Sequence, residues 1–272
     1  MSGTITVDRT AAEALAPQRP WALVRHSLVL GRRSLIKSGR NPGFLMNGVM
    51  TPVIFLVLFY YLFGGAMTGS TGDYLQYLFP GILVMGTILS GMLSTGLNVN
   101  LDRKNGVADR FRSLPIGRSA PLIGSVLADT VRYVLAAAVL FGVGCLMGFR
   151  VETDFASALG AVGIAILFAF CLSWVTVLIG VLVKDEGAVL GFAFVAFLPL
   201  VLGTSLAAPK STLPGWLEAW AGVNPVTHAM DATRGLLTGG AVADPVGKTL
   251  LWSAVVLVIF APLAVLANRR AD

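Results

Sequence analysis

Hydrophobic residues along this chain gather into six long runs that contain no charged residue. About 17–25 helical residues cross the hydrocarbon core of a bilayer, and the runs have this length or lie at its lower edge. Backbone polar groups in lipid must be bonded within their own element, so each run is expected to be a helix. The runs cover residues 41–72, 74–101, 133–149, 155–183, 187–209 and 249–268.

These runs predict an all-α polytopic membrane protein with six transmembrane helices, in a membrane domain at residues 41–272. Composition supports this class, because 56% of the residues are hydrophobic and 12% are charged, which is about half the charged share of an average soluble domain. Strands of a membrane barrel would alternate in polarity over about ten residues, and these runs do not alternate. The expected helices have the approximate bounds 43–64, 75–98, 126–149, 156–183, 187–208 and 249–268.

The chain before the first helix is polar and basic, and it divides into two segments. Residues 1–20 carry charges and lack the apolar stretch of a cleaved signal peptide, so we expect a disordered cytosolic tail. In residues 21–40, Trp21, Val24 and Leu28 share one helical face, and the arginines fall largely elsewhere. This pattern predicts an amphipathic helix on the inner membrane surface. An unstructured basic tail is the alternative.

Lysines and arginines are distributed unevenly between the two sides of the predicted bundle. Of the 20, most lie before the first helix, between the second and third helices, at Lys184 or at the C-terminus; the other side holds Arg150, Lys210, Arg234 and Lys248. The positive-inside rule therefore predicts cytoplasmic termini. Topology and anionic lipid headgroups then explain the net charge of +6, and no nucleic-acid partner is needed.

Residues 210–244, before the last run, are too polar to span a membrane and too regular for a slack loop. Leu213, Trp216, Leu217 and Trp220 are spaced for a short amphipathic helix, with tryptophans at interface depth. After Asn224-Pro225, a second helix would be lined by Val226, Met230, Leu236 and Leu237, and would end at Gly239-Gly240. On the outer side, the two helices would either dip into the membrane as re-entrant helices or lie flat on it.

The most charged stretch lies between the second and third helices. Val107, Phe111 and Leu114 are spaced i, i+4 and i+7, one face of a short helix that Pro115 would end. The residues that project elsewhere are charged: Asp109, Arg110 and Arg112. A cytosolic helix with an apolar knob and a charged rim suits docking into a groove on a partner protein. An ordinary loop that touches the bilayer is the alternative.

Three passages carry a resemblance to a known family. The central one reads YLFPGILVMGTILSGMLSTGLNVNLD followed by NGVADRFRSLPIGRSAPLIGSVLADTVR, the late one NPVTHAMDATRGLLTGG, and the early one NPGFLMNGVMTPVIFLVLFYYLFGGA. Together they resemble permeases of ABC exporters of the second (ABC-2) type, especially the daunorubicin-resistance permeases of actinobacteria. The likeness spans nearly the whole chain after Trp21.

This resemblance implies a permease subunit in a bacterial cell membrane that exports a hydrophobic or amphiphilic compound, such as a drug, polyketide or lipid. It implies six helices, cytoplasmic termini and a coupling helix between the second and third. It also implies an ABC ATPase partner, usually two copies with two permease chains, here expected to be identical. Phe111 would anchor the coupling helix, with Arg110 and Arg112 at its rim. No catalytic residue or cofactor is expected on this chain, because ATP and magnesium would bind the partner.

Two polar groups are candidates for further roles. Asp129 and Arg132 lie i, i+3 at the entrance to the third helix, where we expect an orienting salt bridge near the inner interface rather than a proton relay. His228, Asp231 and Arg234 follow one another at intervals of three residues, so they share a face of the predicted second outer helix. We expect them to form a structural network rather than a catalytic site.

Aromatic residues suggest a possible substrate path, with lipid-facing or packing positions as the alternative. They are Phe55, Phe59, Tyr60, Phe192 and Phe197. The stretch Gly247-Lys248-Thr249 resembles the end of a phosphate-binding loop, but Val242 stands where that loop needs glycine, so ATP binding by this chain is not expected. A proton-coupled secondary transporter and an integral membrane enzyme are the alternatives to the exporter.

Overall fold

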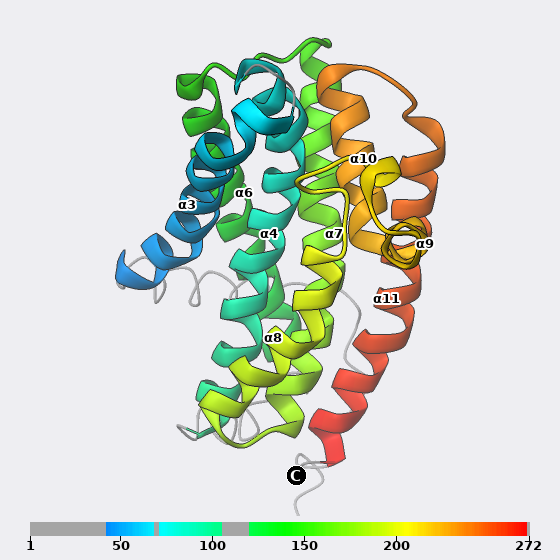
Figure 1. The fold of residues 1–272 in the computed structure, drawn as a ribbon. Coiled ribbons are helices and arrows are strands. Elements are labelled where there is room, and N and C mark those ends of the chain that lie inside the picture. Colours follow the sequence, from blue (N-terminus) through cyan, green and yellow to red (C-terminus); the bar gives the residue numbers. More distant parts are fainter. Residues whose placement is uncertain (1–41, 68–70, 105–119, 271–272) are drawn as a thin grey trace, which may run out of the picture.

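The computed structural model describes residues 42–67, 71–104 and 120–270, and these residues form a bundle of helices with no strand among them (Figure 1). The predicted tail at 1–20, the predicted interfacial helix at 21–40 and the predicted coupling residues Val107, Asp109, Arg110, Phe111, Arg112 and Leu114 lie outside the described residues. The elements in chain order are α3 (Pro42–Met67), α4 (Thr71–Lys104), α6 (Ala120–Met147), α7 (Phe155–Leu182), α8 (Glu186–Leu202), the 3₁₀ turn η1 (Lys210–Thr212), α9 (Gly215–Val223), α10 (Pro225–Thr238) and α11 (Ala243–Arg270).

Four of these helices are long and apolar enough to cross a membrane: α4, α6, α7 and α11. Two shorter apolar helices accompany them within the described part of the chain, Met50–Gly64 in α3 and Glu186–Leu202. The prediction of an all-α membrane protein is therefore confirmed for the described residues. The count of six crossings stays a prediction.

Two ends of the bundle can be distinguished in Figure 1. At the lower end, α4 reaches Lys104, α7 connects to α8, and α11 ends. At the upper end, α6 connects to α7 and α10 connects to α11. The names lower end and upper end are used in this sense below.

Helix boundaries differ from the predicted ones where a proline or a charge lies near a helix end. α8 ends at Leu202 rather than at 208, because Pro199 removes one helical hydrogen bond and Gly203 follows as the C-cap. α4 continues to Lys104 and α11 starts at Ala243, since charged residues are well tolerated in terminal turns that leave the hydrocarbon. Absence of charge therefore marks the apolar part of each helix rather than its full length.

α4 is the central helix, with buried residues over most of its length and contacts with α3, α6, α7, α8 and α10. Its closest neighbour is α7, and glycines permit this approach. A Cβ atom on Gly96 of α4 would lie 2.5 Å from the carbonyl oxygen of Thr176, and one on Gly180 of α7 would clash with the Gly96 carbonyl. Small residues allow helix backbones to touch in this way.

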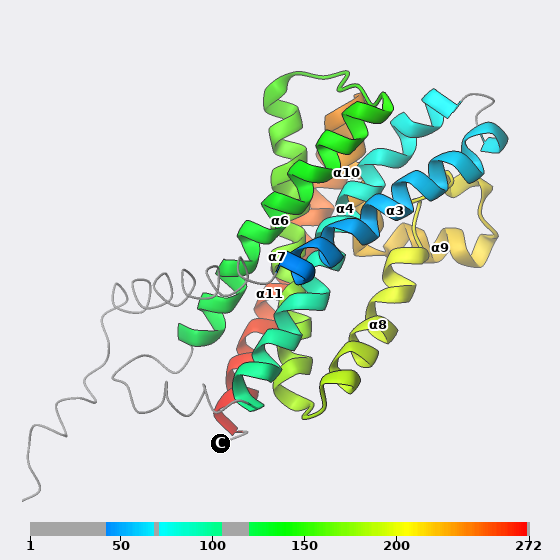
Figure 2. The ribbon, with the colours of Figure 1, turned by 90° about the vertical axis from the view of Figure 1, so that its left-hand side faces the viewer.

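Residues 203–238 form the two short helices that the sequence predicts. Figure 2 shows α9 lying across the bundle, whereas α10 rises from it toward the upper end. α9 exposes Trp216 and Trp220, at 75% and 44%. α10 packs against α4, α7 and α11, and it ends at Gly239 and Gly240, which have φ values of +84° and +127°. α10 therefore packs among the long helices, and the choice between a re-entrant and a flat arrangement in the membrane stays a prediction.

Candidate functional site

The lower end contains a group of contacts in which α4 binds the end of α7, here called the lower clamp. The Nδ2 atom of Asn100 donates hydrogen bonds to the carbonyl oxygens of Gly180 (3.3 Å) and Val183 (2.5 Å). Arg103 donates from its guanidinium to the Val181 carbonyl at 2.6 Å. The last four carbonyls of a helix lack partners within that helix, so side chains from a neighbour can satisfy them.

The lower clamp also extends to the start of α8. Lys104 forms an ion pair of 2.6 Å with Glu186 in the first turn of α8. The side chain of Asp185 caps the same helix by accepting from the Ala188 backbone N–H at 2.8 Å. α4 thus holds both sides of the α7–α8 connection. The predicted coupling residues follow Lys104 directly in the sequence, and α6 begins after them at Ala120.

The predicted pair of Asp129 and Arg132 is confirmed, with 2.7 Å between carboxylate and guanidinium. Asp129 also accepts a hydrogen bond from the Thr95 hydroxyl of α4 at 2.5 Å. Asp129 is 2% exposed and Arg132 is 9% exposed, inside the candidate span Ile123–Met147. The pair is therefore buried within the protein, and through Thr95 it ties α6 to α4. Its predicted position near the inner interface stays a prediction. Such a pair is retained because loss of one partner leaves an uncompensated buried charge.

A second ionic group, here called the upper network, is centred on Asp231 of α10. Its carboxylate accepts from Lys210 at 2.6 Å, from Arg234 at 2.9 Å and from the Ser205 hydroxyl at 3.1 Å. The predicted link between Asp231 and Arg234 is thus confirmed. His228 is 7% exposed on the same helix, but the described contacts include no hydrogen bond between His228 and Asp231.

The upper network joins α10 to α4 and to the irregular residues after α8. The Arg234 guanidinium lies 3.9 Å from the centre of the Tyr77 ring and donates to the backbone carbonyls of Tyr77 and Ser205, each at 3.2 Å. The Tyr77 hydroxyl donates to the Ser205 carbonyl at 2.8 Å, and the Tyr74 hydroxyl donates to the Ala207 carbonyl at 3.2 Å. Sequence reasoning missed both tyrosines, because their partners are backbone atoms that no residue pattern reveals.

Asn224 links three elements and is 2% exposed. Its Nδ2 atom donates to the carbonyl oxygens of Leu200 (2.9 Å) and Gly203 (3.0 Å), at the end of α8. Its Oδ1 atom accepts from the Val226 backbone N–H at 2.9 Å, which makes it the N-cap of α10. The Asn-Pro break is visible in the sequence, but the contact with α8 is not.

The five residues of the predicted substrate path occupy different environments. Phe55 and Phe59 stack along α3 with ring centres 5.9 Å apart. With Tyr60 they pack against the core cluster that contains Phe197, which is 2% exposed. Phe192 of α8 is 58% exposed. Packing in or against the core explains the positions of most of these aromatic residues. The substrate path stays a prediction.

Comparison of the sequence with known proteins identifies its family. The model of the ABC-2 type transporter family matches residues 26–238. A daunorubicin resistance ABC transporter permease protein of Streptomyces coeruleorubidus is 38% identical over 238 residues, which cover 88% of this chain and 84% of the relative. A probable doxorubicin resistance ABC transporter permease protein of Mycobacterium tuberculosis is 24% identical over 249 residues, covering 92% and 90%.

A third relative extends the same likeness. A putative transport permease of Cyanophora paradoxa is 27% identical over 234 residues, which cover 85% of this chain and 80% of the relative. All three relatives are named as permeases, and the family match covers most of the helical bundle. This chain therefore belongs to the ABC-2 type transporter family.

Proposed function

We propose that this chain is the membrane-spanning permease subunit of an ATP-driven exporter for a hydrophobic or amphiphilic compound. The observation that carries the proposal is the family match over residues 26–238, together with relatives named for resistance to daunorubicin and doxorubicin. ATP hydrolysis is assigned to a separate ABC ATPase. Two copies of this chain and two ATPases would form the complete transporter.

The lower end is assigned to the cytoplasm of a bacterial cell. Lys184 lies in the α7–α8 connection, and Arg269 and Arg270 end α11. α4 ends at Lys104 at the same end, and the basic stretch 105–119 follows it in the sequence. Excess positive charge on one side of a bundle favours the cytoplasmic side. The upper network and α9 then belong to the outer half of the protein.

Coupling is assigned to the segment between Lys104 and Ala120, with Phe111 as the apolar anchor on the ATPase. Displacement of this segment would act first on the end of α4. Because the lower clamp fixes α4 to the carbonyls of α7 and to Glu186 of α8, these helices would move with it. Through the contacts of Tyr74 and Tyr77, the same helix reaches the outer segment. Motion at the nucleotide-hydrolysing partner would thus change access at the upper end.

The test is the substitution Phe111→Asp, with Phe111→Leu as the matched control. Membranes that contain the chain and its ATPase are assayed for efflux of a fluorescent amphiphile and for retention of the ATPase on the affinity-tagged permease. We expect the aspartate variant to lose both, because a charge in an apolar docking groove costs several kcal/mol. The leucine variant should keep both. Wild-type efflux and ATPase retention in Phe111→Asp would refute the coupling role.

One observation favours a second candidate, a proton-coupled transporter, because Asp129 lies buried within a candidate membrane span. Intramembrane carboxylates often mark proton pathways. Here, however, the ion pair with Arg132 and the bond from Thr95 favour the charged carboxylate and a structural role. Efflux that persists after ATP depletion and stops when the proton gradient is dissipated would establish this candidate instead.

A further inference from the structure

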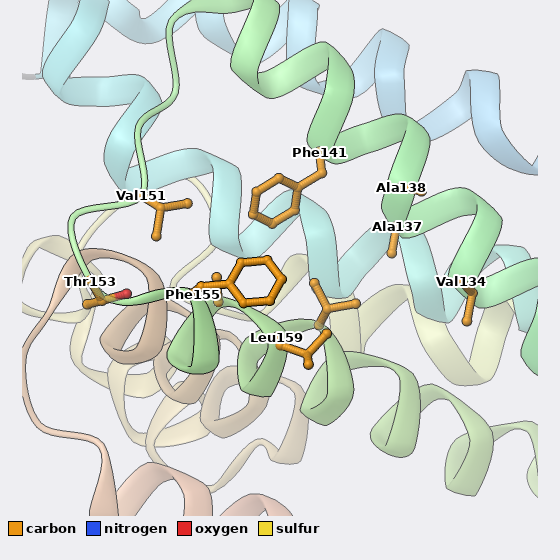
Figure 3. A pocket seen from close by; sticks show the side chains of 10 residues that line it. Val134, Ala137, Ala138, Phe141, Val151, Thr153, Phe155 and Leu159 are labelled. Atoms are coloured by element: carbon orange, nitrogen blue, oxygen red, sulfur yellow. The ribbon is translucent and has the colours of Figure 1, made fainter.

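An apolar pocket of about 480 Å³ opens between α6 and α7 in the upper half of the bundle. Figure 3 shows side chains of α6 on one side, those of α7 on the other, and two residues of the connection between them. The ten lining residues are Val134, Ala137, Ala138, Phe141, Val151, Thr153, Phe155, Ala158, Leu159 and Val162.

The pocket has no polar group free to orient a polar ligand. Thr153 is the single polar residue of the lining, and its hydroxyl donates to the Leu236 carbonyl of α10 at 2.6 Å. A ligand that placed hydroxyl or amide groups here would leave them without partners, at a cost of about 1–3 kcal/mol each. The inserted part of a ligand is therefore hydrocarbon, which disfavours a polycyclic compound rich in polar substituents.

The mouth of the pocket lies on the exposed surface of the bundle. Val134, Leu159 and Phe155 are 50%, 63% and 83% exposed, and they belong to two helices that are candidate membrane spans. A pocket of this size lies within the range of about 300–1,000 Å³ that holds a small ligand. A water molecule needs about two to four polar partners, and this lining offers almost none. Bilayer hydrocarbon is the material that surrounds and can enter it.

The connection between α6 and α7 supplies a charged rim. It leads from α6 into α7, and successive residues along it alternate between two environments. Val151, Thr153 and Phe155 line the pocket, whereas the residues that alternate with them are charged and exposed, namely Arg150, Glu152 and Asp154.

This rim has a fixed position and a mixed charge. Hydrogen bonds from Ser157 lower the pKa of Asp154 below its ordinary value, so it stays ionised. The Glu152 backbone N–H donates to the Leu237 carbonyl at 3.0 Å, which fastens the segment to α10. One cation and two anions suit a headgroup that carries both a phosphate and an ammonium group.

We infer that the α6–α7 pocket is a binding site for one acyl chain of a zwitterionic bilayer phospholipid, whose headgroup lies against Arg150, Glu152 and Asp154. On the proposed topology this lipid belongs to the outer leaflet. Binding itself does not depend on the proposed transport function. Phe141 forms the pocket wall and packs edge-to-face on Phe79 of α4 at 5.3 Å, so the bound chain contacts a residue that packs on the central helix.

The experiment uses the full chain in bilayer nanodiscs that contain phosphatidylethanolamine with a diazirine at mid-chain, followed by peptide mass spectrometry. Annular lipid sets the baseline, measured at Val258 and Leu251 of α11, which are 71% and 64% exposed. We expect labelling at Phe141 and Val162 to exceed this baseline about fivefold, the ratio that a preference of about 1 kcal/mol produces. Labelling equal to the α11 baseline would overturn the inference.

Filling the pocket gives a second measurement. Ala158→Phe places a ring among the lining residues, and Ala254→Phe adds the same ring on an exposed part of α11 as the matched control. The first variant should bring labelling at Phe141 down to the baseline, and the second should leave it unchanged. Undiminished labelling in Ala158→Phe would refute the site.

The headgroup is tested by exchanging the carrier of the diazirine chain. Phosphatidylethanolamine should label the pocket more than phosphatidylglycerol, and Arg150→Gln should reduce this difference. Stronger labelling by phosphatidylglycerol would overturn the assignment of a zwitterionic lipid. Loss of pocket labelling on addition of a polar polycyclic drug would show that cargo rather than lipid occupies the site. None of these readouts measures export, so they stand apart from the test of the proposed function.

Discussion

Asn224→Asp is a nearly isosteric change that tests how the end of α8 is joined to the start of α10. The variant keeps an oxygen that can cap α10 through the Val226 N–H, but it replaces the amide nitrogen that donates to Leu200 and Gly203. An oxygen would then face two carbonyl oxygens at about the distance of a hydrogen bond. The site is buried, so water cannot replace the lost donors.

The magnitude follows from these two bonds. A buried acceptor that loses its donor costs about 1–3 kcal/mol. Protonation of the new carboxyl can restore one donor, so the net loss is expected at about 2–4 kcal/mol, below the sum for two orphaned acceptors. For a chain of this size, a loss of 1 kcal/mol lowers the midpoint of thermal unfolding by about 2–4 °C. The expected decrease is therefore about 5–15 °C.

The assay is intrinsic tryptophan fluorescence of the purified chain in one detergent at a fixed heating rate, because unfolding midpoints of such proteins depend on scan rate. Asn268→Asp, near the end of α11, provides the same chemical change at a half-buried position with no described side-chain bond to another helix. That control should change the midpoint by no more than about 2–4 °C. Equal midpoints for the two variants would refute the conclusion that Asn224 joins α8 to α10.

Substitutions at three further contacts, with their controls, are tested by the same unfolding measurement. Gly180→Ala should destabilise the chain by about 1–3 kcal/mol through contact with the backbone of α4, whereas Gly163→Ala has open space and should stabilise α7 by up to about 1 kcal/mol. Asp129→Ala should cost about 3–5 kcal/mol, and the double variant Asp129→Leu with Arg132→Met should recover most of it, since an apolar pair leaves no buried charge. Lys210→Gln should cost less than about 1 kcal/mol, because its side chain is 34% exposed and solvent screens the pair; a loss as large as that of Asp129→Ala would contradict this ranking.

Sequence periodicity was sufficient for the features that depend on one segment at a time. The charge-free runs located the long helices, and the spacing of Trp216 and Trp220 located α9. The i, i+3 spacing of Asp129 and Arg132 predicted their ion pair. These features are local because their physical causes, apolar length and side-chain spacing on one helix, are written within the segment itself.

The contacts between segments could not be predicted in the same way. Asn100, Arg103 and Asn224 all donate to backbone carbonyls near the end of another helix. Every helix end offers such carbonyls, whatever its residues, so the sequence gives no signal for the choice of partner. The pocket between α6 and α7 likewise depends on how far the two helices diverge. The alanines and valines that line it permit this divergence, but they do not specify it.

Both ends of α4 contact α8 or the residues that directly follow it. At the lower end, Lys104 pairs with Glu186 at the start of α8. At the upper end, Tyr77 and Tyr74 bind the carbonyls of Ser205 and Ala207, just after α8 ends. A rigid helix fixed to both ends of a neighbour cannot slide along it without breaking one set of bonds. We therefore expect displacement of α4 along its axis to move α8 and the Ser205 carbonyl with it, and Arg234, which binds that same carbonyl, to pass the displacement to α10.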